Sequence, residues 1–391
     1  MIKYVGDIFL GGTHNMNTEL KEIIDNIKES GDLYEDAVKE AEARQEVLAK
    51  PTGALGTLED ISIQLAGITG KVKNSMKHQA VVIMSADNGV VDEGVASAPQ
   101  SVTLSQTINF TRHYTGVSSM AKYFGIDLLV VDTGVKMAIP SSLYSAEMTE
   151  EGRLTAKIVN RRIADGTRNL AKEPAMTDEE ALRAIMTGIE AAKAIKDCGY
   201  DIFGVGEMGI GNTTTSACVL AALCGKTGED VVGRGGGLND EGLAKKIRIV
   251  DEANKDLDPA DVTDILAKVG GFDICAMTGA FLGAAYYRIP VVIDGYISAV
   301  AALCAYRLAP KAVNFMFGSH QSKEKGYLIA MDALGVKPYF NLGMRLGEGS
   351  GCPISFKIIE TACAAMNGMA TFAEGAIDAD YLEEGKKGNF F

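Results

Sequence analysis

The stretch IFGVGEMGIGNTT, residues 202–214, decides the fold. It begins with a short apolar run, Ile202–Val205, and a loop rich in Gly and polar residues follows at once. A run of this kind predicts a strand that is buried on both faces. The pattern after the loop is helical, with Asn212 or Thr213 as a possible N-cap. A strand, a Gly-rich loop and a helix in this order are typical of the ligand-binding edge of an open α/β sheet.

The same pattern recurs along the chain. Further apolar runs that predict strands lie at Ala80–Met84, Leu128–Val131, Val291–Ile293, Val313–Phe317 and Pro338–Leu342. Helical patterns lie between or beside them at Glu179–Lys196, Leu238–Lys255, Ser298–Leu308 and Ser322–Leu334, and at the two ends at Asn17–Ala49, Leu58–Ile68 and Ile354–Phe372. Apolar strands that alternate with helices predict an α/β fold in which a parallel sheet is covered on both faces.

The composition excludes several classes of protein. The chain has 391 residues, and its 51 acidic residues outnumber its 38 basic residues, so that the formal net charge is −13. This balance argues against broad binding to nucleic acid or to an anionic membrane. The 44 Gly residues are numerous, and many follow directly after the predicted strands. We therefore expect them to be places where the backbone approaches a ligand closely.

Cysteine usage and hydropathy indicate a cytoplasmic protein. The seven Cys are odd in number and form no CxxC pair, which is typical of reduced core residues. The N-terminus has no apolar run long enough for a signal peptide. The apolar stretch Ile289–Tyr306 contains Asp294 and Gly295, so it predicts a strand, a turn and a helix rather than a membrane span. The four His show no metal-ligand spacing, and no metal site is predicted.

Two Gly-rich loops are candidate phosphate sites. The backbone N–H groups of Gly206–Thr214, with the helix start that follows, suit a phosphate, but a simple strand–helix turn explains the pattern equally well. The loop is neither a Walker A sequence nor a GxGxxG fingerprint, which disfavours a nicotinamide-dependent dehydrogenase. Gly233–Gly237 forms a second such turn, and Lys246 follows it. Lys246 is a plausible phosphate partner, although taken alone it would be a solvated helix residue.

Two carboxylates are candidate catalytic groups. Glu348 lies in the Gly-rich stretch Arg345–Gly351, where it could act as a general base or could only cap backbone N–H groups or pair with Arg345. Glu207 lies at another strand end. Two carboxylates at one sheet edge fit acid–base chemistry, and they also fit stabilisation of a positively charged sugar-like transition state.

Several of these segments together resemble one enzyme family. They are Gly206–Thr214, Lys268–Asp273, Asp294–Tyr296, Met344–Gly351 and the early segment Lys50–Gly56. In this order they are similar to the nicotinate-nucleotide:dimethylbenzimidazole phosphoribosyltransferase family, which builds the lower nucleotide loop of cobalamin. The resemblance covers roughly residues 50–369 and is carried by several long motifs.

The resemblance implies both a fold and a reaction. The fold would be a Rossmann-like parallel sheet with helices on both faces in a large domain (76–354), plus a small helical domain from both chain ends (1–75 and 355–391). The reaction would move phosphoribose from nicotinate mononucleotide to a cobamide lower-ligand base, with release of nicotinate and inversion at the anomeric carbon. It would need no cofactor and no metal, because the pyridinium leaves as a neutral ring.

The resemblance also implies roles for individual residues. Glu348 matches the base that takes the proton of the acceptor, and Glu207 matches a second glutamate near the ribose. The phosphate and ribose region would contain Gly209, Gly211, Asn212, Thr213, Gly235, Gly236, Lys246 and Ser319. The acceptor pocket would contain Ala98, Gln106, Arg345 and Leu346.

The chain departs from the family pattern at the acceptor pocket. Ala98 stands where a Ser is common, and Asn88 stands where a His is common. A less polar pocket would suit a phenol, so a phenol- or p-cresol-accepting enzyme that acts as one subunit of a heterodimer is an alternative to a homodimer. A non-catalytic partner subunit is a further alternative, but retention of both Glu207 and Glu348 argues against it. The residues before Asn17 and the Glu/Lys-rich tail after Asp378 have no predicted function.

Overall fold

The computed structural model describes residues 13–235 and 237–378. Within these residues the main sheet has seven strands, all parallel to their neighbours, in the order β3-β6-β2-β1-β7-β8-β9. The strands are β1 (Gln79–Ala86), β2 (Asp127–Gly134), β3 (Tyr144–Ser145), β6 (Ile158–Asn160), β7 (Ile202–Met208), β8 (Val291–Ile293) and β9 (Met316–Phe317). A separate antiparallel pair consists of β4 (Thr149–Glu150) and β5 (Arg153–Leu154).

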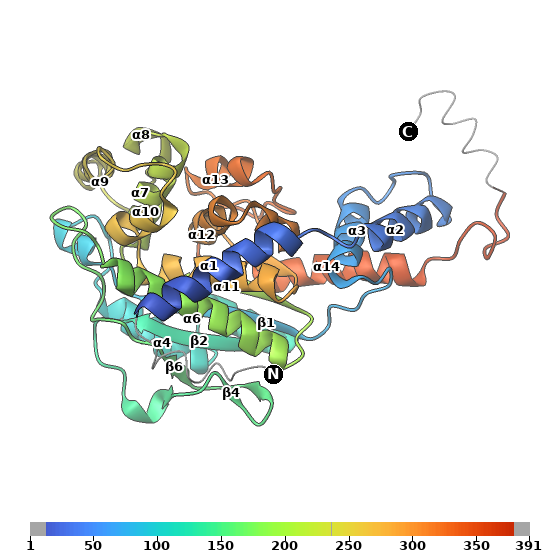
Figure 1. The fold of residues 1–391 in the computed structure, drawn as a ribbon, viewed down its shortest axis with the longest axis horizontal. Coiled ribbons are helices and arrows are strands. Elements are labelled where there is room, and N and C mark those ends of the chain that lie inside the picture. Colours follow the sequence, from blue (N-terminus) through green and yellow to red (C-terminus); the bar gives the residue numbers. More distant parts are fainter. Residues whose placement is uncertain (1–12, 236, 379–391) are drawn as a thin grey trace.

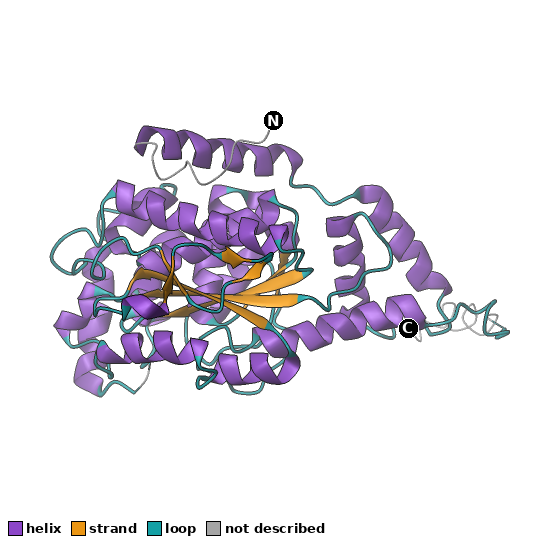
Figure 2. Ribbon diagram, turned by 90° about the horizontal axis from the view of Figure 1, so that it is seen from below, coloured by secondary structure: helices purple, strands orange, loops and turns teal. Residues whose placement is uncertain are grey.

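Helices cover both faces of the sheet, as Figure 2 shows. On one face α6 (Asp178–Asp197), α11 (Phe272–Tyr286) and α12 (Tyr296–Leu308) pack together. On the other face lie α4 (Ser101–Thr111), α5 (Gly116–Phe124) and α14 (Cys352–Gly368). Every residue of β1 is buried, because both faces of this central strand are covered. The predicted α/β fold with a parallel sheet is confirmed.

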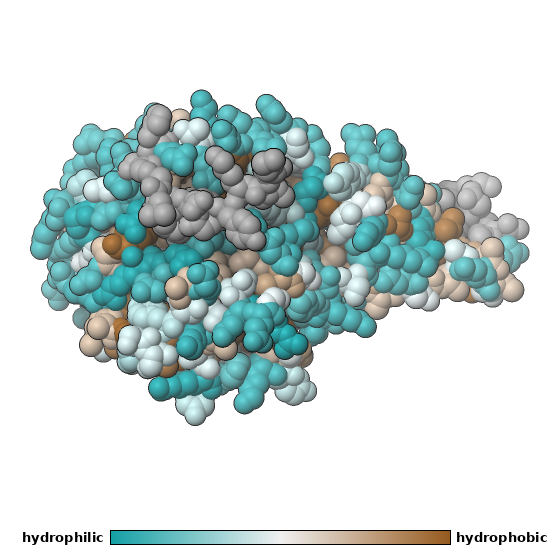
Figure 3. All heavy atoms as spheres, turned by 60° about the horizontal axis from the view of Figure 1, so that its bottom comes forward, coloured by the Kyte–Doolittle hydropathy of each residue, from teal (hydrophilic) through white to brown (hydrophobic). Residues whose placement is uncertain are grey.

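The remaining helices lie around this core. Five of them are α7 (Asn212–Cys224), α8 (Gly228–Val231), α9 (Asp240–Ala253), α10 (Val262–Val269) and α13 (Tyr327–Leu334), and three short 3₁₀ helices are η2 (Gly89–Glu93), η3 (Ser141–Leu143) and η4 (Pro310–Phe315). None of the helices in the described ranges is long and apolar enough to cross a membrane. The face of the molecule in Figure 3 is mostly hydrophilic, with apolar residues in scattered places.

Three helices form a smaller group at one end of the molecule (Figure 1). Helices α2 (Glu35–Val47) and α3 (Thr57–Thr69) pack against each other, and α3 packs on α14, with Ala41, Ala66 and Met366 among the buried contacts. Arg44 donates a hydrogen bond to the Met366 carbonyl, so segments from both ends of the chain meet here. By contrast, α1 (Thr13–Ser30) lies on α11 and α6 of the sheet domain. The predicted domain boundaries stay a prediction.

Some predicted elements were wrong in extent. The helical pattern 17–49 is two helices, because the chain turns at Gly31, where a Cβ would lie 2.4 Å from the Ile27 carbonyl oxygen. The run Val313–Phe317 is mostly the 3₁₀ turn η4, which begins at Pro310, and only Met316–Phe317 are strand. Pro338–Leu342 makes a single bridge, from Phe340 to His320. The helix predicted from Ser322 begins at Tyr327, and the strands β3 and β6 were not predicted.

The strand order fixes where a ligand can bind. The chain leaves β1 toward β2 on one side and later returns to place β7 on the other side. The carboxyl ends of β1 and β7 therefore flank the point at which the strand order reverses. In open α/β sheets this point opens a crevice between the loops, because the connections leave in opposite directions.

Candidate active site

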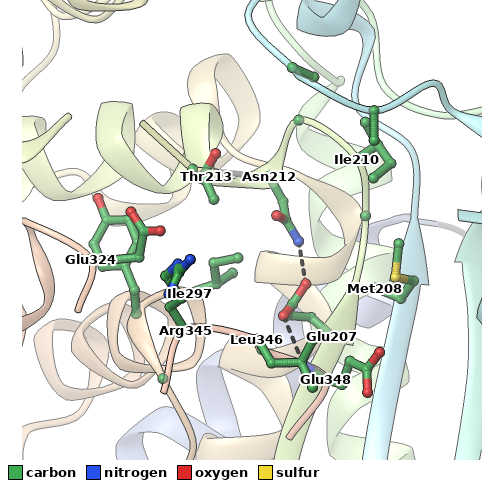
Figure 4. A pocket seen from close by; sticks show the side chains of 18 of the residues that line it. Glu207, Met208, Ile210, Asn212, Thr213, Ile297, Glu324, Arg345, Leu346 and Glu348 are labelled. Carbon is green, nitrogen blue, oxygen red and sulfur yellow. Dashed lines mark hydrogen bonds between the residues drawn. The ribbon is translucent and has the colours of Figure 1, made fainter. Parts of the chain in front are cut away.

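A pocket of about 590 Å³ occupies this crevice, and the loops after β7 and β8 line it together with the stretch 345–348 (Figure 4). The predicted site residues that line it are Ala98, Gln106, Glu207, Gly209, Gly211, Asn212, Thr213, Gly235, Lys246, Arg345, Leu346 and Glu348. Residues more than two hundred positions apart in the sequence thus share one pocket. Gly236 lies outside the described residues.

Glu207 is the carboxylate at the end of β7. Its Oε2 accepts a hydrogen bond from Asn212 Nδ2 at 2.5 Å, and its Oε1 accepts one from the backbone N–H of Glu348 at 3.2 Å. Figure 4 shows both bonds as dashed lines. Burial raises the pKa of Glu207 to about 8, and the nearby Asp273 carboxylate acts in the same direction. The hydrogen bonds from Asn212 and Glu348 oppose this rise only in part.

Glu348 is held in an unusual backbone conformation. Its φ is 65°, and the flanking residues Gly347 and Gly349 have φ values of 81° and 84°. A glutamate in this left-handed region carries local strain, which persists only where the surroundings fix it. The two Gly residues avoid a further cost, because neither has a Cβ. The sequence showed a Gly-rich turn here, but it did not show that the Glu itself shares the left-handed conformation.

The Glu348 carboxylate lies at the N-terminus of helix α5. Oε2 accepts a hydrogen bond from Val117 N at 3.1 Å, and Oε1 accepts one from Gln106 Nε2 at 3.4 Å. Burial raises the pKa of Glu348, whereas the backbone N–H groups of Val117 and Gly116 lower it. The positive end of the helix also favours the ionised form. Of the alternatives left open by the sequence, pairing with Arg345 is not what holds the carboxylate.

Asp294 holds the loop that carries Glu348. Its Oδ2 accepts a hydrogen bond from Gly349 N at 3.0 Å, and its Oδ1 accepts one from Gly351 N at 2.6 Å. In the sequence Asp294 follows a predicted strand, but no role is predicted for it. The signal that could have found it is the same as for Glu207, namely a carboxylate directly after a buried apolar run.

The phosphate side of the pocket is formed by the start of α7 and by Lys246. Lys246 Nζ donates to Thr213 Oγ1 at 2.8 Å, and the Lys246 side chain is only 1% exposed. The interpretation of Lys246 as a solvated helix residue is therefore wrong. Burial lowers the pKa of Lys246 to about 8, and Glu324 opposes this shift. Neither Asn212 nor Thr213 caps α7, since its N-cap is Gly211 without a side-chain bond.

Ser319 does not reach the pocket directly. It is fully buried, and its Oγ donates to the backbone carbonyl of Asp294 at 2.7 Å. The lining residues from this strand end are His320 and Ser322. Both ring nitrogens of His320 lack a hydrogen-bond partner among the described residues, although Asp294 Oδ1 lies 3.6 Å from His320 Nε2. A ribose or phosphate role for Ser319 stays a prediction.

No group of three or more His, Cys, Asp or Glu side chains within residues 13–235 and 237–378 is arranged to hold a metal ion. The expectation that the reaction needs neither metal nor cofactor stays a prediction.

Comparisons with known proteins show the family to which the chain belongs. A family model described as phosphoribosyltransferase matches residues 31–377. A protein of Clostridium perfringens named nicotinate-nucleotide–dimethylbenzimidazole phosphoribosyltransferase is 54% identical over 356 residues, which cover 90% of this chain and 95% of that protein. A protein of the same name from Clostridium tetani is 46% identical and covers 89% and 93% of the two chains. The crystal structure of CobT from Thermus thermophilus superimposes with a TM-score of 0.82 at 36% identity, over 88% of this chain and 99% of that one.

Proposed function

The chain belongs to the phosphoribosyltransferase family of these relatives, and we propose that it transfers phosphoribose from nicotinate mononucleotide to 5,6-dimethylbenzimidazole. The bond from ribose C1′ to the pyridine nitrogen breaks, and nicotinate leaves. A bond from C1′ to a ring nitrogen of the acceptor forms on the opposite face, which gives an α-riboside 5′-phosphate. The observation that carries this proposal is the Glu348 carboxylate, held at the N-terminus of α5 in the pocket that Glu207 also lines.

Glu348 is the general base of the proposed reaction. As a ring nitrogen of the acceptor attacks C1′, the N–H proton of the imidazole ring moves to a Glu348 carboxylate oxygen. The bonds from Val117 N and Gln106 Nε2 support this role, because they fix the direction of the carboxylate, and the Val117 N–H opposes the rise in pKa that burial causes. After transfer the proton leaves to solvent with the products.

Glu207 stabilises positive charge in the proposed reaction. The pyridinium of the donor is cationic, and positive charge develops at the ribose as the glycosidic bond lengthens. An ionised carboxylate in a buried pocket favours that charge strongly, because the surrounding dielectric is low. Since nicotinate departs with a neutral ring nitrogen, no general acid is required. We therefore propose that no cofactor or metal takes part, and treatment with a chelator should leave the rate unchanged.

The donor phosphate would bind at the start of α7. The backbone N–H groups of the first helical turn and the positive helix end suit an anion. Lys246 supports this placement, because its ammonium is buried in the pocket beside Thr213. A bound phosphate dianion would supply the negative partner that this ammonium needs.

The acceptor would lie on the apolar side of the pocket. Ala98 and Val102 line the pocket together with Met208 and Leu346, and these side chains suit the flat hydrocarbon edge of a benzimidazole. Gln106 is the polar group beside the base, because its amide contacts Glu348. Ala98 offers no hydroxyl to the acceptor, so recognition would depend more on shape than on hydrogen bonding.

The test is an acceptor panel with the isolated chain. The protein is incubated with nicotinate mononucleotide and either 5,6-dimethylbenzimidazole, phenol or p-cresol, and nicotinate and the riboside product are measured by chromatography. We expect release of nicotinate with the benzimidazole. Release with the phenols alone, or only after addition of a related second subunit, would replace the proposed acceptor and assembly. No release with any acceptor would reject phosphoribosyl transfer by this chain.

We also propose that the enzyme acts as a cytoplasmic homodimer. The seven Cys are all free thiols, which suits a reducing compartment. Tyr114 and Tyr123 are 77% and 83% exposed, and Tyr is enriched at interfaces between protein chains. Light scattering of the purified chain measures the assembly, and a monomeric mass would contradict the proposed dimer.

A further inference from the structure

The segment Lys268–Asp273 is one of the family motifs, yet the proposed reaction gives it no role. Asp273 lies in the first turn of α11, and its side chain is fully buried. It is not among the residues that line the pocket. A buried carboxyl is costly, and a chain keeps one only where its partners or its function require it.

Asn212 links Asp273 to Glu207. Its Nδ2 donates to Glu207 Oε2 at 2.5 Å and to Asp273 Oδ2 at 2.9 Å. A side-chain amide has two N–H donors, and both are used here. The orientation of Asn212 is thus fixed from both sides, and it in turn fixes the Oε2 atom of Glu207. If Asp273 were absent, Asn212 would be held only through Glu207, and its amide could rotate.

The neighbouring backbone leaves space for the Asp273 carboxyl. A Cβ at Gly209 would lie 2.9 Å from Asp273 Oδ2, and a Cβ at Gly271 would lie 2.4 Å from Asp273 Oδ1. Asp273 Oδ1 has no hydrogen-bond partner among the described residues, and the same holds for the nearby Asn88 Oδ1. Both atoms are acceptors and cannot bond each other, so the hydrogen bond from Asn212 is the side-chain contact that holds the Asp273 carboxylate.

The charged groups that shift the pKa values of Glu207 and Asp273 are carboxylates. Glu207 faces Asp273 and Asp294, and Asp273 faces Asp87 as well. Burial raises the pKa of Asp273 to about 6 and that of Glu207 to about 8. Near neutral pH the two carboxyls therefore keep one proton between them in the free enzyme. A cationic donor favours the ionised form of Glu207, because opposite charges attract.

We propose that Asp273 is a positioning residue, which through the Asn212 amide holds Glu207 in the orientation and charge state that the donor site needs. This inference rests on the proposed role of Glu207. It gives the Lys268–Asp273 motif a function that requires no contact with either substrate.

Two variants of Asp273 separate the effect of its hydrogen bond with Asn212 from the effect of its negative charge. Asp273→Asn keeps an oxygen that can accept from Asn212 but removes the negative charge, whereas Asp273→Ala removes both. Asp132→Asn is the matched control, because Asp132 is equally buried at the end of β2 but does not contact Asn212. For Asp273→Ala we expect kcat to fall about tenfold with KM for the donor little changed, since a mispositioned group acts mainly on the transition state. Asp132→Asn should not change kcat in this way.

The pH dependence of kcat/KM tests whether the negative charge of Asp273 acts on Glu207. Glu207 loses its negative charge as the pH falls through its pKa, and this loss forms the acid limb of kcat/KM. Asp273→Asn removes a like charge, so the Glu207 pKa falls and the acid limb moves to lower pH by about one unit. A residue with only a structural role would lower the thermal midpoint without moving this limb. An acid limb that coincides with wild type would overturn the proposal.

Two further measurements keep the test decisive. In a Glu207→Gln background, Asp273→Asn should have no additional effect on the residual rate, and independent effects would contradict action through Glu207. Infrared difference titration of the protonated carboxyl band, with Glu207→Gln as the reference, reports Glu207 ionisation without catalysis. We expect Asp273→Asn to move that titration to lower pH even if no acceptor in the panel reacts. An unmoved titration would reject the role of Asp273, whereas an inactive wild type would reject only the proposed reaction.

Discussion

The two carboxylates of the pocket are held in opposite ways. Glu348 receives its hydrogen bonds from Val117 N at the positive end of α5 and from the Gln106 amide. Glu207 faces Asp273 and Asp294, and the amide that bonds its Oε2 is shared with Asp273. Burial raises the pKa of both carboxyls, but the backbone N–H groups at the start of α5 offset part of this rise at Glu348, whereas the Asp273 carboxylate adds to it at Glu207.

The difference corresponds to two chemical tasks. A general base must be ionised before the reaction and must lose its proton to solvent afterwards. Leu346, two residues before Glu348, is 57% exposed, so the loop that carries Glu348 lies near the mouth of the pocket. A carboxylate that stabilises a cationic sugar is needed only while the cation is present. A raised pKa suits Glu207 to this task, because the ionised form is favoured when the donor binds.

Replacement of the base should have the largest effect. Glu348→Gln keeps the size of the side chain and an oxygen for Val117 N but cannot accept the acceptor proton. We expect kcat to fall by about 10³-fold, within the usual range for loss of a general base. The measurement is nicotinate release under saturating substrates. Donor binding by calorimetry and the thermal midpoint serve as controls, and both should match wild type. A rate within tenfold of wild type would remove Glu348 as the base.

The contact between the Glu348 loop and Glu207 can be tested at Gly347. A Cβ at this position would lie 2.4 Å from Glu207 Oε1, so Gly347→Ala should displace Glu207 or the Glu348 loop. We expect kcat/KM to fall by about 10²-fold, because a displacement near 1 Å is enough to cause such a loss.

Gly343→Ala is the matched control for this variant. Gly343 also has a positive φ, 68°, but a Cβ there would meet only the flexible end of Lys323. Both variants suffer backbone strain, and only one disturbs the carboxylates. Equal losses of activity in the two variants would mean that strain, rather than the Glu207 contact, sets the effect.

The buried ammonium of Lys246 should control the affinity for the donor rather than the rate of transfer. Lys246→Met removes the ammonium beside Thr213, and we expect KM for nicotinate mononucleotide to rise about 30-fold with kcat little changed. Since the pKa of Lys246 is about 8, the wild-type ammonium loses its charge as the pH rises through this value. The wild-type kcat/KM should therefore fall above pH 8, and the variant should lack this fall. Lys245→Met is the control, because Lys245 is partly exposed and pairs with Glu93.

Much of the fold could be predicted from the sequence. The strands β1, β2, β7 and β8 are long enough, or apolar enough, to be recognised from composition alone. The short strands β3 and β6 could not be recognised, because two or three residues show no periodicity and their pairing depends on β2. Pro338–Leu342 shows the opposite error, since an apolar run that begins with Pro and ends with an exposed Leu342 forms no strand.

Most residues of the site could be predicted from the sequence, but the contacts between them could not. Position after an apolar run identified Glu207, and a Gly-rich turn identified Glu348. Neither pattern shows that Asp294 holds the Glu348 loop or that Asn212 joins two carboxyls, because these contacts join segments far apart in the chain. The burial of Lys246 was also hidden, since its environment is created by the packing of α9 on α7.

The smallest expected effect concerns the acceptor side. Ala98→Ser would add a hydroxyl to an apolar part of the pocket, where a benzimidazole nitrogen could accept a hydrogen bond. We expect kcat/KM for 5,6-dimethylbenzimidazole relative to p-cresol to rise about fivefold, which is the value of one neutral hydrogen bond. Ala96→Ser, in the same loop, is the control and should leave the ratio unchanged. An equal gain for both acceptors would mean that the hydroxyl acts on Glu348 or on the loop. In that case, the choice of acceptor would depend on the Glu348 loop rather than on the apolar side of the pocket that contacts the acceptor ring.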